Sequence, residues 1–441
     1  MPRAALLALL LAVCGSGGAA AERYEISPPA PGTCPTEDGI ARIANTLLPG
    51  DELVLRDGTY CQTGRRLIEV SGRPDRLIVI RAAAGAAPIL TRPDDPRGPQ
   101  RHQGTEVRGA HLILRGLRFH RGIRGLVFHA GAHHITVEDC EVAYTANNGL
   151  TLNNGDTDSF IIRRNHIHHT GNLAPELGET EGEGMYIGCN WAECIASNHL
   201  IENNHIHHLK ATSHGGNDGI ELKYGAHGNV VRGNVIHTIL PGWKDIRFPC
   251  INASGVRDRD IAAPNLIEGN RLSGCGEAIQ AIADAVIRDN LVVNSETALA
   301  TYNHEQVPVQ RNVHILNNTF YGTSVALEFG VNAGTGAARK PAPTGIVFSG
   351  NAVYGWGLRP LLTVNLPLGG DVTIRNNAVE GLSETGRLRI VATGGLTLDD
   401  AAFFDGRSAP DAFIDPAGGD FRPTPGSPLD RHHVGCCGER R

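Results

Sequence analysis

The chain repeats a short phrase in which apolar residues flank an asparagine. The first copy spans residues 162–167, with Asn165 near its centre, and the phrase returns almost to the end of the chain. Further copies occupy residues 201–206, 231–236, 267–272, 287–292, 315–320, 347–353 and 374–379. Successive asparagines lie from 20 residues apart, between Asn270 and Asn290, to 39 residues apart, between Asn165 and Asn204. A short repeated unit separated by loops of different lengths is typical of a solenoid.

The alternation of apolar and polar residues predicts coils of two or three short parallel strands, whose inward side chains stack on the next coil. The asparagine then lies at the same bend of every coil, where it tolerates left-handed backbone and bonds to its neighbour. We therefore predict a parallel β-helix in which one line of asparagines stacks, namely Asn165, Asn204, Asn234, Asn270 and Asn290. Cys140 takes the same place in residues 137–142, where a small buried thiol fits.

A second strand of each coil begins near a glycine or alanine. Period-two alternation puts one residue of each strand into the core, namely Leu150, Met185, Ile220, Ile251, Ile279 and Leu299. The first outward column is then Val127, Thr151, Tyr186, Glu221, Asn252, Gln280, Ala300 and Glu328. The next is His129, Asn153, Gly188, Lys223, Ser254, Ile282, Tyr302 and Gly330. We expect these columns to form an exposed face along which a sugar chain lies; an ordinary solvated face is the alternative.

The two ends of the chain differ from the repeats. Residues 1–21 predict a secretory signal, with Arg3, an apolar stretch at 4–13 and small residues at 19–21; a lipoprotein signal ending at Cys14 is the minor alternative. Residues 22–107 predict an N-terminal cap with the first coils, in which a short helix near residues 40–44 covers the open end. Residues 108–395 form the β-helix, and 396–441 an irregular tail. These features predict a secreted or periplasmic protein without a membrane span.

Charge and cysteine content narrow the class further. The formal net charge of −6 and the pI near 6.4 argue against nucleic acid as a partner, and we expect a monomer. Of ten cysteines, Cys14 lies in the signal and Cys140 in the asparagine line, which leaves an even number. In an exported protein we expect the disulfides Cys34–Cys61, Cys189–Cys194 and Cys250–Cys275, with Cys140 free. The partners of Cys436 and Cys437 stay open.

The N-terminal block, with "PGD" at 49–51 and "DGTY" at 57–60, resembles the entry segment of right-handed parallel β-helix proteins of the pectate-lyase-like superfamily. Residues 420–431, "DFRPTPGSPLDR", resemble the closing segment of its carbohydrate-active members. The resemblance covers nearly the whole mature chain and implies the right-handed fold. It is less informative about function, because this scaffold carries lyases, hydrolases, epimerases and non-catalytic adhesins.

Residues 217–223, "NDGIELK", resemble the D-G-F-A-x-K stretch of polysaccharide lyase family 9, in which the lysine is the Brønsted base. The resemblance implies that Lys223 is the base and that Asp218 shares the motif. A lyase removes the proton α to a uronate carboxylate, which needs a neutral base and a cation. Lysine serves if its pKa is lowered, whereas Glu221 opposes this unless a metal binds it. The alternative is a surface pair of Glu221 with a Lys223 side chain that points to solvent.

Other candidate residues surround this motif. Acidic residues on the glycine-rich segment before Tyr186 suit Ca²⁺, so we predict Glu179, Glu181, Glu183 and Asp218 as ligands; a solvated acidic loop is the alternative. The family's calcium ligands are aspartates, and they do not match these residues one to one. For protonating the leaving oxygen we consider Tyr186, His208 and His214. For binding substrate we consider Asn153, Glu221, Asn252, Gln280, Tyr302, Arg247, Arg257 and Arg259.

Histidine is frequent, with 20 residues, and three histidines occupy the same place in three coils. His168, His207 and His237 each follow a repeat asparagine by three residues, so their rings should stack. Ser273, Val293, Tyr321 and Tyr354 continue the column, which favours a stacking ladder over a zinc or copper site.

The sequence therefore favours a polysaccharide lyase that acts on an acidic, uronate-containing glycan by β-elimination. Two signatures on the same scaffold are absent: the L-R-H-G motif of another lyase family, and the N-T-D, D-D, G-H-G and R-I-K set of polygalacturonase-type hydrolases. A non-catalytic glycan-binding or surface-structural solenoid is the first alternative. A metal-handling exported β-helix protein is the second.

Overall fold

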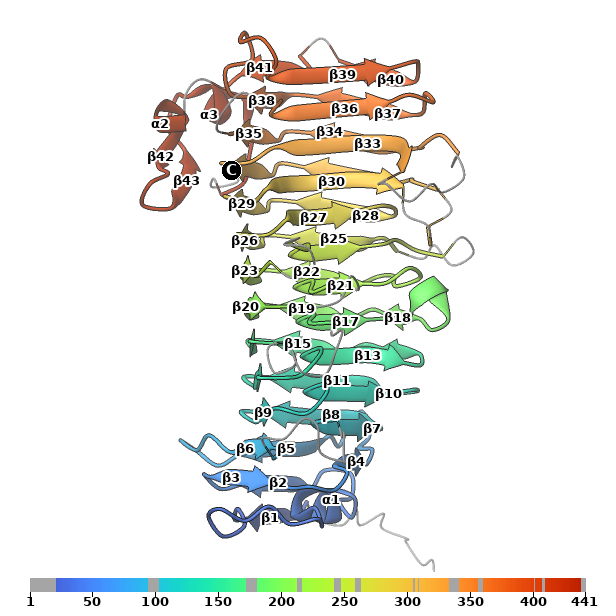
Figure 1. Cartoon of the computed structure of the whole chain (residues 1–441), viewed down its shortest axis with the longest axis vertical. Coiled ribbons are helices and arrows are strands. Elements are labelled where there is room, and N and C mark those ends of the chain that lie inside the picture. The colour runs from blue at the N-terminus through green and yellow to red at the C-terminus, as the bar shows by residue number, and fades with distance from the viewer. Residues whose placement is uncertain are drawn as a thin grey trace, which may run out of the picture.

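The chain winds into a long stack of coils in which three parallel sheets run side by side (Figure 1). The structure is a computed structural model that describes residues 21–93, 103–171, 181–211, 216–241, 247–257, 263–303, 306–307, 309–332, 341–355, 360–399, 401–406 and 409–437. We name the three sheets A, B and C in the order in which each coil passes through them. No helix in the described part of the chain is long and apolar enough to cross a membrane.

Each sheet collects one short strand from nearly every coil. Sheet A contains β1 (Arg23–Ile26), β2 (Glu52–Leu55), β5 (Ile78–Ala82), β8 (Ala110–Arg115), β11 (His133–Glu138), β15 (Ile161–Arg163), β19 (Leu200–Glu202), β22 (Val230–Arg232), β25 (Asn265–Glu268), β28 (Ala285–Arg288), β31 (Val313–Leu316), β34 (Ile346–Ser349), β37 (Val372–Arg375) and β40 (Leu396–Leu398), with β14 (Thr157–Asp158) and β18 (Ala196–Ser197) beside it.

Sheets B and C follow the same order along the axis. Sheet B contains β3 (Thr59–Cys61), β6 (Ile89–Thr91), β9 (Arg118–His120), β12 (Glu141–Ala143), β16 (His166–His168), β20 (His205–Leu209), β23 (Val235–Ile239), β26 (Arg271–Ser273), β29 (Leu291–Val293), β32 (Thr319–Tyr321), β35 (Ala352–Tyr354), β38 (Asn377–Val379) and β41 (Phe403–Asp405). Sheet C contains β4 (Leu67–Glu69), β7 (Thr105–Arg108), β10 (Leu126–His129), β13 (Leu150–Asn154), β17 (Met185–Ile187), β21 (Ile220–Leu222), β24 (Ile251–Ala253), β27 (Glu277–Ala281), β30 (Thr297–Asn303), β33 (Val325–Asn332), β36 (Leu362–Leu366) and β39 (Leu388–Ala392).

The apolar core runs through the middle of the stack. The residues predicted to point inward from sheet C are fully buried, namely Leu150, Met185, Ile220, Ile251, Ile279 and Leu299. Neighbours in this line pair directly across the sheet, as in Met185 with Ile220. Because like residues stack on like, each coil covers the apolar surface of the next, and burial of that surface drives the winding.

The asparagine line is confirmed. Asn165 Nδ2 donates to Asn204 Oδ1 at 2.9 Å, and the same bond recurs from Asn204 to Asn234 at 3.0 Å. The line continues through Asn270, Asn290, Asn318, Asn351 and Asn377. Cys140 starts it as predicted, because its backbone N–H donates to Asn165 Oδ1 at 3.0 Å and its thiol is free. Burial raises the pKa of this thiol to about 12, so it is unreactive.

A second, shorter ladder lies at the bend that leads into sheet A. The backbone N–H of His199 donates to Asn229 Oδ1 at 2.9 Å, and Asn229 Nδ2 donates to Asn265 Oδ1 at 3.0 Å. His199 in turn accepts the backbone N–H of Phe160 at its Nδ1. The sequence analysis missed this ladder, although its members precede the same strand in successive coils.

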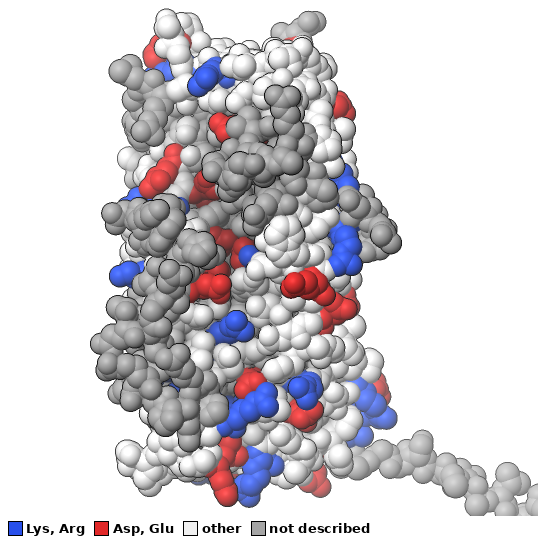
Figure 2. All heavy atoms as spheres, turned by 45° about the vertical axis from the view of Figure 1, so that its right-hand side comes forward, with Lys and Arg blue, Asp and Glu red and all other residues white. Residues whose placement is uncertain are grey.

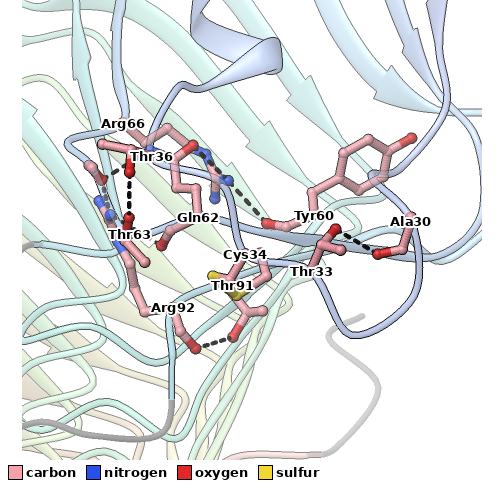
Figure 3. Close-up of a disulfide and its surroundings, with 12 residues drawn as sticks. Ala30, Thr33, Cys34, Thr36, Tyr60, Gln62, Thr63, Arg66, Thr91 and Arg92 are labelled. Carbon is pink, nitrogen blue, oxygen red and sulfur yellow. Dashed lines mark hydrogen bonds between the residues drawn. A yellow bond between two sulfur atoms is a disulfide. The ribbon is translucent and has the colours of Figure 1, made fainter.

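A short helix, α1 (Gly39–Ala44), lies at the N-terminal end of the β-helix (Figure 1). Asp38 caps it by accepting the backbone N–H of Ile40 at 2.9 Å, and Ile40 and Ala44 are buried in the core. That the helix shields the open strand edge stays a prediction. Beside it, Arg66 donates to the carbonyl oxygen of Tyr60 at 2.9 Å, next to the Cys34–Cys61 disulfide (Figure 3).

The three predicted disulfides are present. Cys34 bonds to Cys61, Cys189 to Cys194 and Cys250 to Cys275. Cys436 and Cys437, whose partners the sequence left open, are adjacent in the chain and bond to each other.

The described part of the C-terminal tail contains strands and short helices, which corrects the expectation of an irregular segment at 396–441. Strands β40 and β41 still belong to coils. Beyond them lie α2 (Ala409–Ala412), the antiparallel pair β42 (Phe413–Asp415) and β43 (Asp420–Pro423), and α3 (Pro428–His432). Phe413, Phe421 and Leu429 pack with Tyr354 and Ala378 on the outer face of sheet B. The tail folds because its apolar residues cover this face, beside β35 and β29 in Figure 1.

The outward columns of sheet C need two register corrections. Ala300 pairs with Ala326, so Glu328 lies two residues beyond the column and pairs with Asn365 instead. His129 pairs with Asn154 rather than Asn153. The change at His129 occurs where a bulge shifts the register, an event that a fixed two-residue period does not predict. At Glu328 the pairing up to Thr301 is regular, so the predicted column was offset by two residues.

Candidate active site on sheet C

Three polar residues occupy the corner at which successive coils turn into sheet C. Asn148, Glu183 and Asp218 each directly precede a glycine. Backbone hydrogen bonds join the corners of successive coils. The N–H of Gly149 donates to the carbonyl of Glu183 at 2.8 Å, and that of Gly184 to the carbonyl of Asp218 at 2.9 Å. Adjacent corners therefore hold these side chains in one column, a strand spacing apart.

The glycines of this corner are required by close packing between coils. A Cβ on Gly149 would lie 2.7 Å from the carbonyl oxygen of Gly184, and one on Gly184 would lie 2.6 Å from that of Gly219. A Cβ on Gly219 would lie 2.4 Å from the carbonyl oxygen of Cys250. A polar residue followed by glycine is thus the local sequence that places a side chain at this corner.

The first outward column is in the predicted register. Tyr186 pairs with Glu221, Glu221 with Asn252, and Asn252 with Gln280. The face is not exposed as expected, however, because these four residues are only 7, 5, 8 and 5% accessible, respectively. Polar groups held in such a desolvated place interact more strongly than they would on an open surface.

Lys223 lies in the middle of this face and is buried, which corrects the expectation that it points to solvent. Its ammonium donates a short hydrogen bond to Glu221 Oε1 and lies 4.5 Å from the centre of the Tyr186 ring. Its side chain is 11% exposed. The pair is therefore not an ordinary surface ion pair, and its energetics follow those of buried charges.

The charges of this site are unbalanced. Burial raises the pKa of the Glu183, Asp218 and Glu221 carboxyls, and their mutual repulsion adds to the effect at Glu183 and Asp218. Burial alone disfavours the Lys223 ammonium, but Glu221, Tyr186 and Asp218 outweigh this and raise its pKa. One ammonium thus faces three carboxyls in a desolvated place. On the face turned to the viewer in Figure 2, acidic side chains gather at mid-height with basic atoms beside them.

Several buried oxygens of this site have no hydrogen-bond partner among the described residues. They are Glu183 Oε1, Asp218 Oδ1, Glu221 Oε2, Asn148 Oδ1 and Asn252 Oδ1. The opposite atoms of the same groups are bonded: Asn148 Nδ2 donates to Glu183, and Asn252 Nδ2 donates to Asp218 at 3.2 Å. Buried unpaired oxygens are costly, and carboxylate and amide oxygens are the ligands that calcium prefers. The donor types therefore suit calcium, but Glu183, Asp218 and Glu221 are not among the described groups of three whose ligand atoms lie within 4.8 Å of one another.

The structure places some of the remaining candidates near this site. Tyr302 donates to Glu277 Oε2 at 3.2 Å, and Glu181 lies close enough to raise the pKa of Glu183. Asn153 Oδ1 is another buried oxygen without a partner in the described chain. Arg257 donates to the carbonyl oxygen of Ala192.

Other candidates lie elsewhere or outside the described residues. Arg247 bonds Glu296 at 3.1 Å and is partly exposed. His208 belongs to sheet B, where its ring stacks on His169 at 5.0 Å. Glu179, His214 and Arg259 lie outside the described residues.

Sequence reasoning missed three residues of this region. Asn148 and Glu277 both belong to the corner column. Glu277 joins it because its carbonyl accepts the N–H of Cys250 at 3.0 Å. The recurrence of the same corner in successive coils could have identified both residues. Trp191 lies in η1 (Asn190–Ala192), inside the loop closed by Cys189–Cys194, and is 56% exposed. The loop reaches the site because the Tyr186 hydroxyl donates to Asn190 Oδ1 at 3.0 Å.

Comparisons with known proteins agree on the fold. A family model described as "Right handed beta helix region" matches residues 98–239. The PL6 family alginate lyase AlyGC has a TM-score of 0.53 at 16% identity, over 86% of this chain and 53% of that chain. A mannuronic acid specific family 6 lyase from human gut microbiota has a TM-score of 0.50 at 16% identity, over 84% and 91%. No curated protein matches the chain. The chain thus has a right-handed parallel β-helix fold.

Proposed function

We propose that the protein is a secreted or periplasmic polysaccharide lyase that cleaves a uronate-containing glycan by β-elimination. The observation that carries the proposal is the group of buried, partnerless carboxylate oxygens around Lys223 and Tyr186 on sheet C. A cation and a base side by side are what proton abstraction next to a carboxylate requires. The disulfides suit an exported protein.

Glu183, Asp218 and Glu221 would hold calcium, together with the amide oxygens of Asn148 and Asn252. Of the predicted ligands Glu179, Glu181, Glu183 and Asp218, this set keeps Glu183 and Asp218 and replaces the other two. A bound calcium ion supplies positive charge that balances the carboxylates and stabilises the charge that develops on the uronate carboxyl. In the structure Glu221, Tyr186 and Asp218 raise the pKa of Lys223 against the effect of burial; with the carboxylates balanced, burial would instead lower it.

In the proposed reaction, neutral Lys223 Nζ takes the proton from the carbon α to the uronate carboxyl. The electron pair of that C–H bond forms a C=C double bond, and the C–O bond to the neighbouring sugar breaks. Tyr186, whose ring centre lies 4.5 Å from Lys223 Nζ, would protonate the departing oxygen. Asn153, Gln280, Tyr302, Arg247 and Arg257 are the described candidates for binding sugar hydroxyls and carboxylates, and Arg259 is a further candidate from the sequence. His208, predicted as a proton donor, lies on sheet B instead, and His214 lies outside the described residues.

Ultraviolet absorbance of the new double bond tests the function directly. Two similarly folded structures are of an alginate lyase and a mannuronic acid specific lyase, so alginate is tested first, followed by pectate and glycosaminoglycans. Absorbance that grows with calcium and disappears with EDTA supports the lyase. Binding of these polymers without product supports instead the non-catalytic glycan-binding protein.

A further inference from the structure

Sheet B carries a cluster of imidazole rings that the proposed lyase does not use. The outward residues of β16, β20 and β23 include five histidines, which we call the histidine surface: His166, His168, His205, His207 and His237. The rings stack along the axis: His166 on His205 at 5.1 Å, His168 on His207 at 5.3 Å and His207 on His237 at 5.0 Å. The predicted stack of His168, His207 and His237 is thus confirmed, and a second column stands beside it.

Ring nitrogens of the two columns face one another across the surface. His166 Nε2 lies 2.7 Å from His207 Nε2, and His205 Nε2 lies 2.9 Å from His237 Nε2. One nitrogen each of His166, His205 and His207 falls within 4.8 Å of the others. Glu141, on the preceding coil, forms an adjoining group with His166 and His168. Stacking alone does not require ring edges to converge in this way.

The other nitrogen of each inner ring is held by the residue that follows it. His168 Nδ1 lies 2.7 Å from His169 Nδ1, and His207 Nδ1 lies 2.6 Å from His208 Nδ1. In the third coil His237 Nδ1 pairs with the hydroxyl of Thr238 at 2.8 Å. The following residue has left-handed backbone each time, with φ of 54°, 56° and 56°. A partner at Nδ1 fixes the ring and directs Nε2 outward, as is usual for metal-binding histidines.

We propose that His166, His205 and His207 bind a divalent transition-metal ion of the zinc or copper class on the outer face of sheet B. Imidazole nitrogens suit these ions, whereas the carboxylate and amide oxygens of sheet C suit calcium, so the two faces select different metals. Three protein ligands leave a position for water. Zinc holds two ligand nitrogens about 3.3 Å apart at bond lengths of about 2.0–2.1 Å. The His166 and His207 rings, whose Nε2 atoms lie 2.7 Å apart, therefore separate slightly on binding, which their partial exposure permits.

The test is calorimetric titration of the full chain with zinc, after removal of metals and in excess calcium so that the oxygen site is filled. We expect saturable zinc binding that His166→Gln and His207→Gln each weaken at least tenfold. His314→Gln, which removes an imidazole from β31 of sheet A, is the matched control and should bind zinc as the wild type does. Circular dichroism of each variant shows whether the coils persist; His205→Gln, at the most exposed ring, is the reserve if another variant misfolds.

Two further outcomes decide the location of the ion. His111, His133 and His134 form another possible group, and loss of zinc binding in His133→Gln but not in His166→Gln would overturn the proposal. So would loss of zinc binding in Glu183→Gln. Copper added in place of zinc should give an electron paramagnetic resonance spectrum with couplings to several nitrogens. A spectrum without nitrogen couplings contradicts the site, whether or not the protein is an active lyase.

Discussion

The same two coils carry opposite chemistry on neighbouring sheets. On sheet B, histidine rings of these two coils find partners in one another, with nitrogens 2.6–2.7 Å apart. On sheet C, the carboxylates of the next strands are buried, and several of their oxygens have no partner in the described chain. An imidazole both donates and accepts, so a stack of histidines satisfies itself, whereas carboxylates only accept. Histidines repeated in successive coils therefore stabilise one another, whereas repeated buried carboxylates need an added cation.

The largest expected effect is on catalysis. In calcium, Lys223→Ala should lower turnover about 10³-fold, because it removes the proposed base. In EDTA the substitution also leaves Glu221 buried without its cation, which we expect to cost about 3–5 kcal/mol of unfolding free energy. The absorbance assay and chemical denaturation measure the two effects. The double variant Lys223→Ala, Glu221→Gln should recover stability but not activity; recovered activity would exclude Lys223 as the base.

The next largest effect is stabilisation by calcium, which should depend on the carboxylates whose oxygens have no partner in the described chain. Calcium at about 100 times its Kd should stabilise the wild type by about 2.7 kcal/mol, seen as a rise in Tm. Glu183→Gln and Asp218→Asn should each weaken calcium binding about tenfold, which removes about 1.4 kcal/mol of binding free energy. Glu106→Gln is the control, since this carboxylate of β7 already has Arg65 and His129 as partners. An unchanged calcium effect in Glu183→Gln would contradict the site.

The two faces should respond to pH with opposite sign in metal-free protein. The pKa of Glu183 and Asp218 is raised by burial, so their contribution to stability is full at low pH and is lost as pH rises above about 4. Burial lowers the pKa of His166 to about 4 and of His207 to about 3, so their contribution is present above about pH 6.5 and is lost as pH falls.

Thermal unfolding across pH, in EDTA, tests this difference. The double variant Glu183→Gln, Asp218→Asn should lose less stability than the wild type as pH rises. His166→Gln, His207→Gln should lose less as pH falls from about 6.5. Parallel profiles for all three proteins would show that neither face controls the pH dependence.

The smallest expected effect concerns the exposed ring beside sheet C. Trp191→Ala should raise KM about three- to tenfold with little change in kcat, if the ring stacks on a sugar, because aromatic contacts contribute about 0.5–1.5 kcal/mol. Trp191→Phe should retain most of the affinity. An equal loss of kcat in Trp191→Ala would indicate instead that the ring positions Tyr186 through Asn190.

The fold was predictable because the same sequence pattern recurs in nearly every coil. Asn165 and its successors specify the bends, Cys140 substitutes in the same slot, and alternation identifies the inward residues from Leu150 to Leu299. Exposure was not predictable, since the two-residue period says which way Lys223 points but not what covers it. The pairing of His129 depends on a bulge. The corner column was missed because its residues precede the strands, outside the period used to align them.

The asparagine line has a direction. Each amide from Asn165 to Asn351 donates through Nδ2 toward the C-terminal coil and accepts at Oδ1 from the preceding one. The side-chain dipoles are thus aligned head to tail in a buried, low-dielectric place, where each bond polarises the next. Removing an amide from the middle of the line interrupts the polarisation of the amides before and after it, whereas removing the last amide affects only those before it. Asn270→Ala should consequently cost more unfolding free energy than Asn377→Ala, although both remove one amide.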